Sequence, residues 1–170
     1  MKESPLKKET SSICCFGDGK GYVVGSIEGR CGVVNIDFDK IEQDQESDFC
    51  FRCHRIEDKN RTPQTTDVYT VNNISFNRQY NTLATAGGDG SYVIWNKDTK
   101  ARYRSSNKSS TVTAPMTNVC FSEDAQVLAF SIGEDYNLGG VAAQQAANQG
   151  NNKPGLYVRK CKQDDVIKRK

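Results

Sequence analysis

The sequence predicts an all-β fold built from repeated small sheets, and its internal repeats carry this prediction. The segment Val71 to Asp98 contains short strand-like runs, the tight turn GGDG, and the β-branched and aromatic run SYVIW. The segment Met116 to Asp135 matches Val71 to Gly90 at a constant offset of 45 residues, without a gap. The same order of strands and turns therefore occurs at least twice.

A third copy lies upstream, in the segment ICCFGDGKGYVVGSIEGRCGVVNID. It places Phe16 sixty residues before Phe76, and it places Glu28 against Asp89 after a slip of one residue. A period near 45 residues with four short strands per unit is typical of WD-type β-propeller blades. The fold class expected is thus a partial WD40 β-propeller of about three blades.

The chain is divided accordingly. The polar connection IEDKNRTPQTTD, Ile56 to Asp67, is expected to be a mobile surface loop between blades. Because closed propellers need about four to eight blades, three blades form an arc, and its open edges are expected to make the isolated chain self-associate. The units expected are a lead-in segment at 1–12, a first blade at 13–56, a second blade at 67–105, a third and incomplete blade at 116–162 with a low-complexity insertion at 137–154, and a charged tail at 163–170.

Composition limits the classes of function. The 170 residues include 23 Lys and Arg against 21 Asp and Glu, a net charge of +2, so bulk charge indicates neither a nucleic-acid nor a membrane partner. There is no apolar run of membrane-spanning length, and the first residues, MKESPLKKETSS, lack the apolar core of a signal peptide. We therefore expect no membrane association and a nuclear or cytoplasmic location.

Seven cysteines are present, and in a reducing compartment most are expected to be small buried side chains. One spacing, Cys50-x-x-Cys53-His54, satisfies the pattern for c-type haem attachment. Alternation along a strand would place Cys50 and Cys53 on opposite faces of the sheet, which argues against haem. A haem carrier remains the alternative of a different class, and we otherwise expect no cofactor and no metal.

Nothing in the sequence indicates catalysis. His54 is the single histidine, and beside two arginines at a strand edge it indicates a structural role. GDGKG, Gly17 to Gly21, lacks the following helix of a phosphate-binding loop and is expected to be a hairpin turn. The chain is therefore expected to be non-enzymatic.

Recognition of another molecule is the remaining class. Arg30 follows the turn SIEG, and Arg52 and Arg55 flank Cys53-His54, beside Phe51, at the end of the same predicted blade. Arginine clamps carboxylates in a bidentate manner and aromatic side chains anchor interfaces, so an acidic peptide is a suitable ligand. The alternative is that Arg30 serves only its own turn and Phe51 only the core.

Several motifs together resemble one family. They are ESPLK from Glu3, SIEGR from Ser26, FCFRCHR from Phe49, DVYTVNNISF from Asp67, LATAGGDG from Leu83 and WNKD from Trp95. The combination is similar to the RNA-export WD-repeat family of the Rae/Gle type, whose sister is the Bub-type spindle-checkpoint propeller. ESPLK, WNKD and EDYNLGG favour the export type over its sister.

The resemblance implies a seven-bladed propeller about twice as long as this chain, which matches its C-terminal blades. It also implies a GLEBS-type acidic partner segment, from a nucleoporin in mRNA export or from a checkpoint kinase for the sister. Candidate peptide-binding residues are Arg30, Phe51 and Arg55. A candidate face for nucleic acid or its mimics, including RNA in a ribonucleoprotein, comprises Phe51, Trp95, Lys97 and Lys100. The sequence departs from the family at Asn96, where the family has Asp.

Overall fold

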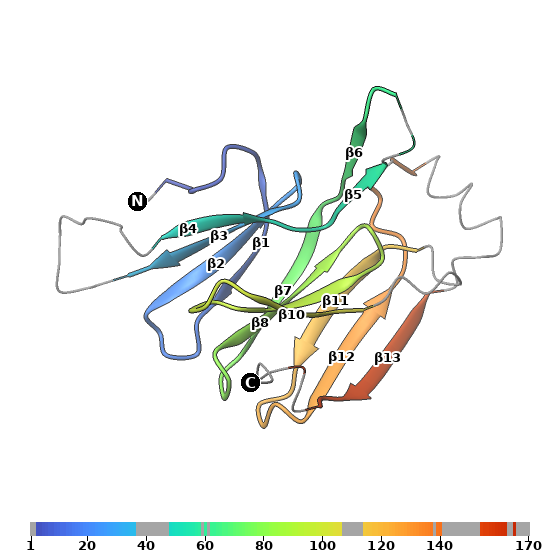
Figure 1. Ribbon diagram of the computed structural model, residues 1–170. Coiled ribbons are helices and arrows are strands. Elements are labelled where there is room, and N and C mark those ends of the chain that lie inside the picture. The colour runs from blue at the N-terminus through green and yellow to red at the C-terminus, as the bar shows by residue number, and fades with distance from the viewer. Residues whose placement is uncertain are drawn as a thin grey trace.

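The computed structural model describes residues 3–36, 48–58, 60, 62–106, 114–137, 139–140, 154–162 and 165, and the elements described there from end to end are strands (Figure 1). The strands are β1 (Thr10–Cys15), β2 (Gly21–Ser26), β3 (Arg30–Asn35), β4 (Phe49–Arg52), β5 (Arg55–Asp58), β6 (Thr65–Val68), β7 (Val71–Asn77), β8 (Thr82–Gly87), β9 (Tyr92–Asn96), β10 (Arg102–Ser105), β11 (Met116–Phe121), β12 (Val127–Ile132) and β13 (Gly155–Lys160).

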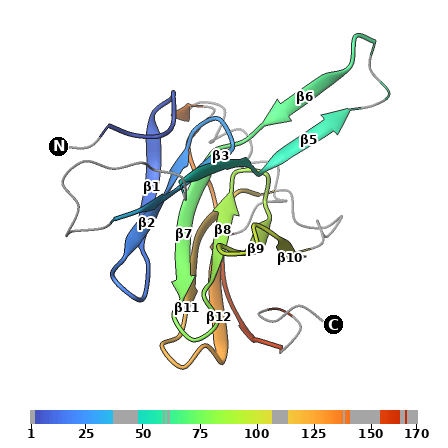
Figure 2. The ribbon, with the colours of Figure 1, turned by 60° about the vertical axis from the view of Figure 1, so that its left-hand side comes forward.

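The strands form three meander sheets and one separate hairpin, all antiparallel. Blade 1 has the order β1-β2-β3-β4, blade 2 the order β7-β8-β9-β10, and blade 3 the order β11-β12-β13. The first strands of the three blades, β1, β7 and β11, are neighbours, so the blades stand side by side as wedges (Figures 1 and 2). The result is an open arc, as expected for a partial propeller.

The strand register repeats from blade to blade. Val71 pairs with Gly87 and Met116 with Ile132, which is the predicted offset of 45 residues. Thr10 pairs with Ser26 at the equivalent point of blade 1, and a bulge follows this first pair in all three blades. The pairing thus confirms that the repeats in the sequence are repeats in the structure.

The alignment of the first copy needs one correction. Cys15 pairs with Tyr22 as Phe76 pairs with Leu83, so residue 15, not Phe16, is equivalent to Phe76. The first and second copies are therefore offset by 61 residues along their whole length from the start of β1. The sequence had suggested an offset of sixty residues followed by a slip of one. The ring of Phe16 still lies near that of Phe76, with centroids 5.5 Å apart, because the two side chains meet across the contact between blades.

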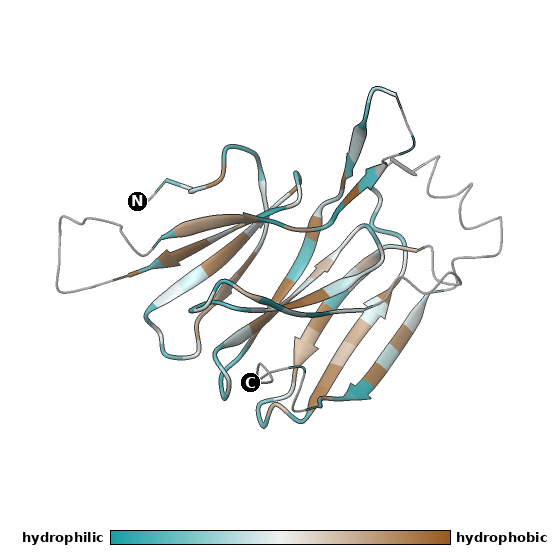
Figure 3. Ribbon diagram, viewed as in Figure 1, coloured by the Kyte–Doolittle hydropathy of each residue, from teal (hydrophilic) through white to brown (hydrophobic). Residues whose placement is uncertain are grey.

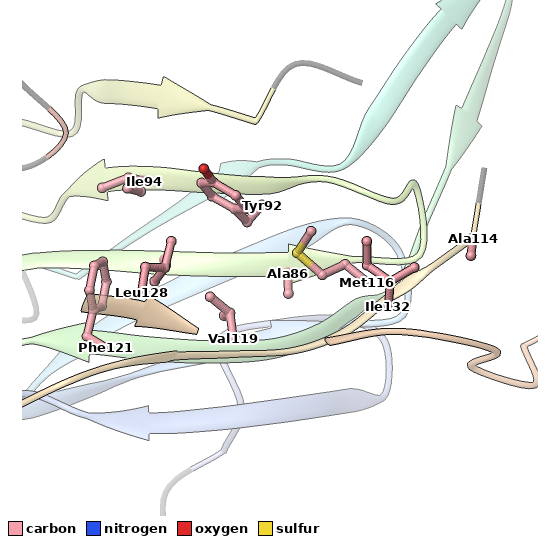
Figure 4. Packing of buried hydrophobic residues seen from close by; sticks show 10 residues of the cluster. Ala86, Tyr92, Ile94, Ala114, Met116, Val119, Phe121, Leu128 and Ile132 are labelled. Atoms are coloured by element: carbon pink, nitrogen blue, oxygen red, sulfur yellow. The ribbon is translucent and has the colours of Figure 1, made fainter. Parts of the chain in front are cut away.

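The hydrophobic core lies between the blades. Ile74 of β7 is buried in a cluster with Val23 and Val33 of blade 1, and Val119 of β11 is buried against Ala84 and the rest of blade 2. Figure 4 shows this second cluster, in which residues of β8 and β9 face residues of β11 and β12. Each blade therefore supplies apolar cover for the next.

The connection from Ile56 to Asp67 is not the loop expected from its polar sequence. β5 and β6 pair from Arg55 with Val68 to Asp58 with Thr65, and this hairpin projects away from the blades (Figures 1 and 2). The β-branched pair Thr65 and Thr66 favours a strand, and the two strands satisfy each other's backbone groups without a core. A two-stranded arm can therefore form from residues that show no apolar alternation.

Some expectations fall outside the described residues. Most of the insertion at 137–154 and of the tail at 163–170 cannot be compared with the structure.

β1 begins at Thr10, three residues before the strand expected from Ile13, and GDGKG forms the turn between β1 and β2, with Gly19 at φ 71°. In the described part of the chain, no helix is both long and apolar enough to cross a membrane.

Candidate functional site

The turn that joins β2 to β3 presents Arg30. Gly29 adopts a φ of 61°, and the Glu28 amide donates to the Ser26 hydroxyl at 3.3 Å, which fixes the turn. The Arg30 side chain is 37% exposed, and its Nε lies 3.5 Å from Glu28 Oε1 without a hydrogen bond to it. Arg30 is thus paired with the carboxylate of its own turn and its Nε is buried, and only the part of the side chain that stays exposed is available to a carboxylate from outside.

Arg55 stabilises this turn through hydrogen bonds to its backbone. Its Nη2 donates to the Glu28 carbonyl at 2.8 Å and its Nε donates to the Gly29 carbonyl at 3.3 Å. The guanidinium is thus engaged with the backbone of the turn that carries Arg30. Sequence reasoning placed Arg55 at the same site as Arg30, and the structure brings them together through the turn itself.

An aromatic row lies on the outer side of blades 1 and 2. The rings of Phe51 on β4 and Trp95 on β9 have centroids 4.7 Å apart, and the Phe49 ring lies 6.1 Å from that of Phe51. Lys100 Nζ stands 4.5 Å above the Phe49 ring, a cation–π contact. Phe51, Trp95 and Lys100, expected on one face, therefore lie in one group with Phe49, but Phe51 and Trp95 are half-buried and pack against the core between blades 1 and 2.

Lys97 lies apart from this row. Its Nζ is 2.7 Å from Asp98 Oδ1 and 5.0 Å from the centroid of the Phe16 ring. Only 12% of its side chain is exposed. Its charge is paired and covered, so of the residues expected on the nucleic-acid face it is the least accessible.

A hydrogen-bond chain lies beneath the aromatic row and connects four elements. Trp95 Nε1 donates to Thr85 Oγ1 at 3.1 Å, and Thr85 Oγ1 lies 2.9 Å from His54 Nε2. His54 Nδ1 lies 2.9 Å from Asp89 Oδ1. Because an indole N–H only donates and a carboxylate only accepts, every bond in the chain can run in one direction, from Trp95 to Asp89.

This chain gives His54 a structural role. The residue is 4% exposed and comes from the segment between β4 and β5, while Asp89 comes from the turn after β8. Burial favours a raised pKa for Asp89, but hydrogen bonds from His54 and Ser91 outweigh it and hold the pKa of this carboxyl below its ordinary value. The charged carboxylate therefore stabilises the junction between blades 1 and 2.

A cleft of about 240 Å³ opens between the hairpin and the outer strands of blade 2. Its walls include three arginines, Arg52, Arg55 and Arg102, together with Trp95. Sequence reasoning named Arg52 and Arg55 as the arginines that flank Cys53 and His54, and it missed Arg102. Strand pairing places Arg52 opposite Arg30 across β3 and β4, and it places Arg102 opposite Trp95 across β9 and β10.

The cysteines do not form a haem attachment site. Cys50 is exposed on β4, whereas Cys53 is buried with its Sγ 3.6 Å from that of Cys31. The two thiols of the Cys-x-x-Cys pattern therefore point to different sides, and His54 is held within the hydrogen-bond chain. Among the described residues, no three His, Cys, Asp or Glu side chains gather as metal ligands.

Comparison with known proteins agrees with this geometry. The chain is 40% identical over 137 residues to the poly(A)+ RNA export protein of Schizosaccharomyces pombe, covering 80% of this chain and 36% of that protein. It is 38% identical to mRNA export factor GLE2 of Chaetomium thermophilum, covering 81% and 36%, and 36% identical to Protein RAE1 of Arabidopsis thaliana, covering 81% and 35%. The chain thus spans slightly more than a third of the length of these relatives.

A solved structure shows the same fold. The β-propeller domain of Cps50 (Swd1) from Myceliophthora thermophila superposes with a TM-score of 0.55 at 12% identity, over 78% of this chain and 35% of that one. No family model matches the sequence. The fold and the relatives define a protein of the WD-repeat β-propeller class. Within that class, the chain belongs to the RNA-export WD-repeat family, as its motifs predict.

Proposed function

We propose that this chain serves nuclear export of mRNA as a non-enzymatic adaptor, and that it binds an acidic, GLEBS-type segment of a nucleoporin. The relatives named for RNA export support the process, and they imply work at the nuclear pore, between nucleus and cytoplasm. They also favour export over the spindle checkpoint. The binding mode is supported by the Arg30 side chain, which is 37% exposed on a braced turn.

The chemistry of the surface fits an acidic segment. Arg30 and Arg52 are paired across β3 and β4, so two cations lie next to each other at this rim of blade 1. The guanidinium of Arg55 donates its hydrogen bonds to backbone carbonyls of the turn, so the role of Arg55 is to position Arg30. Phe51 is the neighbour of Arg52 on β4 and is paired with Cys31, so its ring faces the core on the side of the strand opposite to Arg30 and Arg52.

The experiment measures the affinity of the chain for a synthetic acidic GLEBS-type nucleoporin peptide by calorimetry. Arg30→Glu replaces attraction by repulsion, and we expect the Kd to rise by roughly 10-fold to 100-fold. Lys20→Glu is the matched control, because it makes the same change of charge in the turn at the opposite end of blade 1. An unchanged affinity for Arg30→Glu would refute the proposal, and preference for a checkpoint-kinase segment would assign the chain to the sister function.

A second ligand is supported by the aromatic row. Phe51 and Trp95 are half-buried rings, with Arg102 paired to Trp95 and Lys100 over the Phe49 ring, and aromatic rings beside cations are the combination that holds single-stranded nucleic acid. If RNA binds here, affinity for an oligonucleotide should fall steeply with salt and should be lost in Lys100→Glu. A shallow salt dependence, which the net charge of +2 favours, would restrict the site to peptides.

A further inference from the structure

Two of the seven cysteines are in contact inside the molecule. Cys31 on β3 is 0% exposed, Cys53 after β4 is 6% exposed, and their Sγ atoms lie 3.6 Å apart. Both belong to the apolar cluster between blades 1 and 2, and Figure 3 shows the hydrophobic stretch of β3 that begins at Cys31. The other cysteines are exposed or half-buried. Burial together with contact therefore distinguishes this pair of thiols.

Strand pairing places the two side chains on one face of blade 1. Cys31 is paired with Phe51, and Cys53 lies two residues beyond Phe51 along the chain. The Cys53 amide donates to the Gly29 carbonyl at 3.0 Å, which extends the pairing of the strands past the end of β4. Cys31 and Cys53 are thus diagonal neighbours, and their sulfur atoms need to approach by about 1.5 Å to reach the length of a disulfide bond.

The two thiols differ in their access to solvent. Cys53 is one of the residues that line the cleft of about 240 Å³, beside Arg52 and Arg55. Cys31 is fully buried, and this burial raises the pKa of its thiol well above the ordinary value, with a smaller contribution from its hydrogen bond with Cys53. A small oxidant in the cleft therefore reaches Cys53 first, while Cys31 is a neutral thiol in contact with it.

We propose that Cys31 and Cys53 are a redox-modification site, in which hydrogen peroxide converts the two thiols into a reversible disulfide. The Cys53 sulfur attacks one peroxide oxygen, the O–O bond breaks, and Cys53 becomes a sulfenic acid as one water leaves. The Cys31 sulfur then displaces the sulfenic oxygen, which leaves as a second water together with the thiol proton. Two thiols and one peroxide thus give one disulfide and two waters, and two electrons pass from sulfur to oxygen.

The surroundings suit the oxidised product. A disulfide carries neither a charge nor an S–H donor, so it fits the apolar cluster that includes Val23, Val33 and Ile74. The two cysteines are 22 residues apart in the chain, so the bond would tie β3 to the corner between β4 and β5. The proposal does not depend on the acidic-peptide function, because no step of the oxidation uses Arg30.

The test is peptide mapping of the purified chain after treatment with hydrogen peroxide and alkylation of the remaining free thiols. Trypsin cleaves after lysine and arginine, and it places Cys31, Cys50 and Cys53 in three different peptides. We expect Cys31 linked to Cys53 as the main disulfide, at least about tenfold above any linkage of Cys50, because thiols in contact have a high effective concentration. Dithiothreitol should release the two peptides again.

Three variants separate the roles of the thiols. In Cys31→Ala, Cys53 loses its partner and should accumulate as a sulfenic acid that dimedone traps. In Cys53→Ala, Cys31 should stay reduced, because it is fully buried. Cys50→Ala is the matched control: Cys50 is exposed on the other side of β4, and its loss should leave the disulfide unchanged.

Thermal unfolding gives a second readout. Because the bond closes a loop, oxidation should raise the Tm of the wild-type chain by about 5 to 10 °C, and it should not do so in Cys31→Ala. A Tm that falls on oxidation would count against a bond that fits the native packing. Peroxide that oxidises the exposed Cys50 while Cys31 and Cys53 stay unlinked in the wild-type chain would overturn the proposal, whether or not the variants fold.

Discussion

At the scale of single residues, the junction between blades 1 and 2 depends on a polar network in an otherwise apolar core. Thr85 is fully buried and has both His54 Nε2 and Trp95 Nε1 as hydrogen-bond partners. Leaving a buried donor or acceptor unsatisfied costs more than a typical hydrogen bond contributes. Thr85 is therefore the member of the network whose loss affects the largest number of partners.

Thr85→Val tests this role, because it keeps the shape of the side chain and removes the hydroxyl. We expect the free energy of unfolding to fall by about 2 to 4 kcal/mol, since two buried groups lose their partner. Urea unfolding followed by fluorescence measures the change. Thr66→Val, at an exposed position of β6, is the control and should change stability by less than about 0.5 kcal/mol. Equal effects of the two substitutions would show that the network contributes little.

Asp89 links the same network to pH. Its pKa is lowered in the folded protein, so the carboxylate contributes stability above the unfolded value near 3.8, and that stability is lost as the pH falls through the folded-state pKa. Asp89→Asn should therefore be less stable than wild type by about 1 to 2 kcal/mol at pH 7. The difference should shrink below about pH 4. Unfolding measured at both pH values checks this, and a difference that stays the same at the two pH values would contradict it.

The sequence predicted only part of this residue-level picture. The indole of Trp95 requires a partner for its N–H, and His54 without a second histidine indicates structure rather than catalysis. The identity of the network could not be predicted, because Thr85, His54 and Asp89 come from three separate segments that only the packing of blade 1 on blade 2 brings together.

At the scale of elements, the turn from β2 to β3 is the part on which the binding site depends. An added Cβ at Gly29 would lie 2.6 Å from the Cys53 carbonyl oxygen, in addition to the strain of a φ of 61°. The turn is thus packed against the segment that leads into the hairpin. Gly29 therefore allows both the backbone conformation of the turn and its close packing against Cys53.

Gly29→Ala should therefore cost more than the backbone strain alone. Gly19 is the matched control, because its φ is 71° and an added Cβ there would meet no atom within 4 Å. We expect Gly29→Ala to lower the free energy of unfolding by at least about 1 kcal/mol more than Gly19→Ala does. Thermal unfolding of the two variants gives the comparison. Equal destabilisation would mean that the turn can move away from Cys53 without cost.

Alternation and turn residues predicted the strands of the blades well, because each blade strand must bury one face against a neighbouring blade. The hairpin of β5 and β6 was missed for the complementary reason. It projects from the body, so its sequence carries no buried face and reads as a polar loop. Pattern analysis detects strands that need a core, and this arm needs none.

At the scale of the whole molecule, the arc is held together by contacts between consecutive blades. An ion network on its outer side adds to the core: the fully buried Asp165 pairs with Arg104 of blade 2 at 2.8 Å and with Arg159 of blade 3 at 2.7 Å. The repeat predicted the order of the blades and their offset. It could not predict this cross-link, because Asp165 lies outside the repeated pattern.

The gathering of charge at one rim is likewise a property of the whole arrangement. Arg30, Arg52 and Arg55 belong to blade 1 and the hairpin, and Arg102 belongs to blade 2. Only the side-by-side placement of the blades puts Arg52, Arg55 and Arg102 around one cleft beside Trp95. The sequence supplied Arg30, Arg52 and Phe51 as candidates, and strand pairing in the structure adds Arg102.

The most direct test of the account is amide hydrogen exchange of the chain with and without the acidic nucleoporin peptide. If the rim of blade 1 is the binding site, the peptide should slow exchange in the turn at 26–30 and along 50–55, and it should leave the turn at 17–20 unchanged. Protection confined to blade 3, or no protection at saturating peptide, would contradict an adaptor that holds its partner at Arg30.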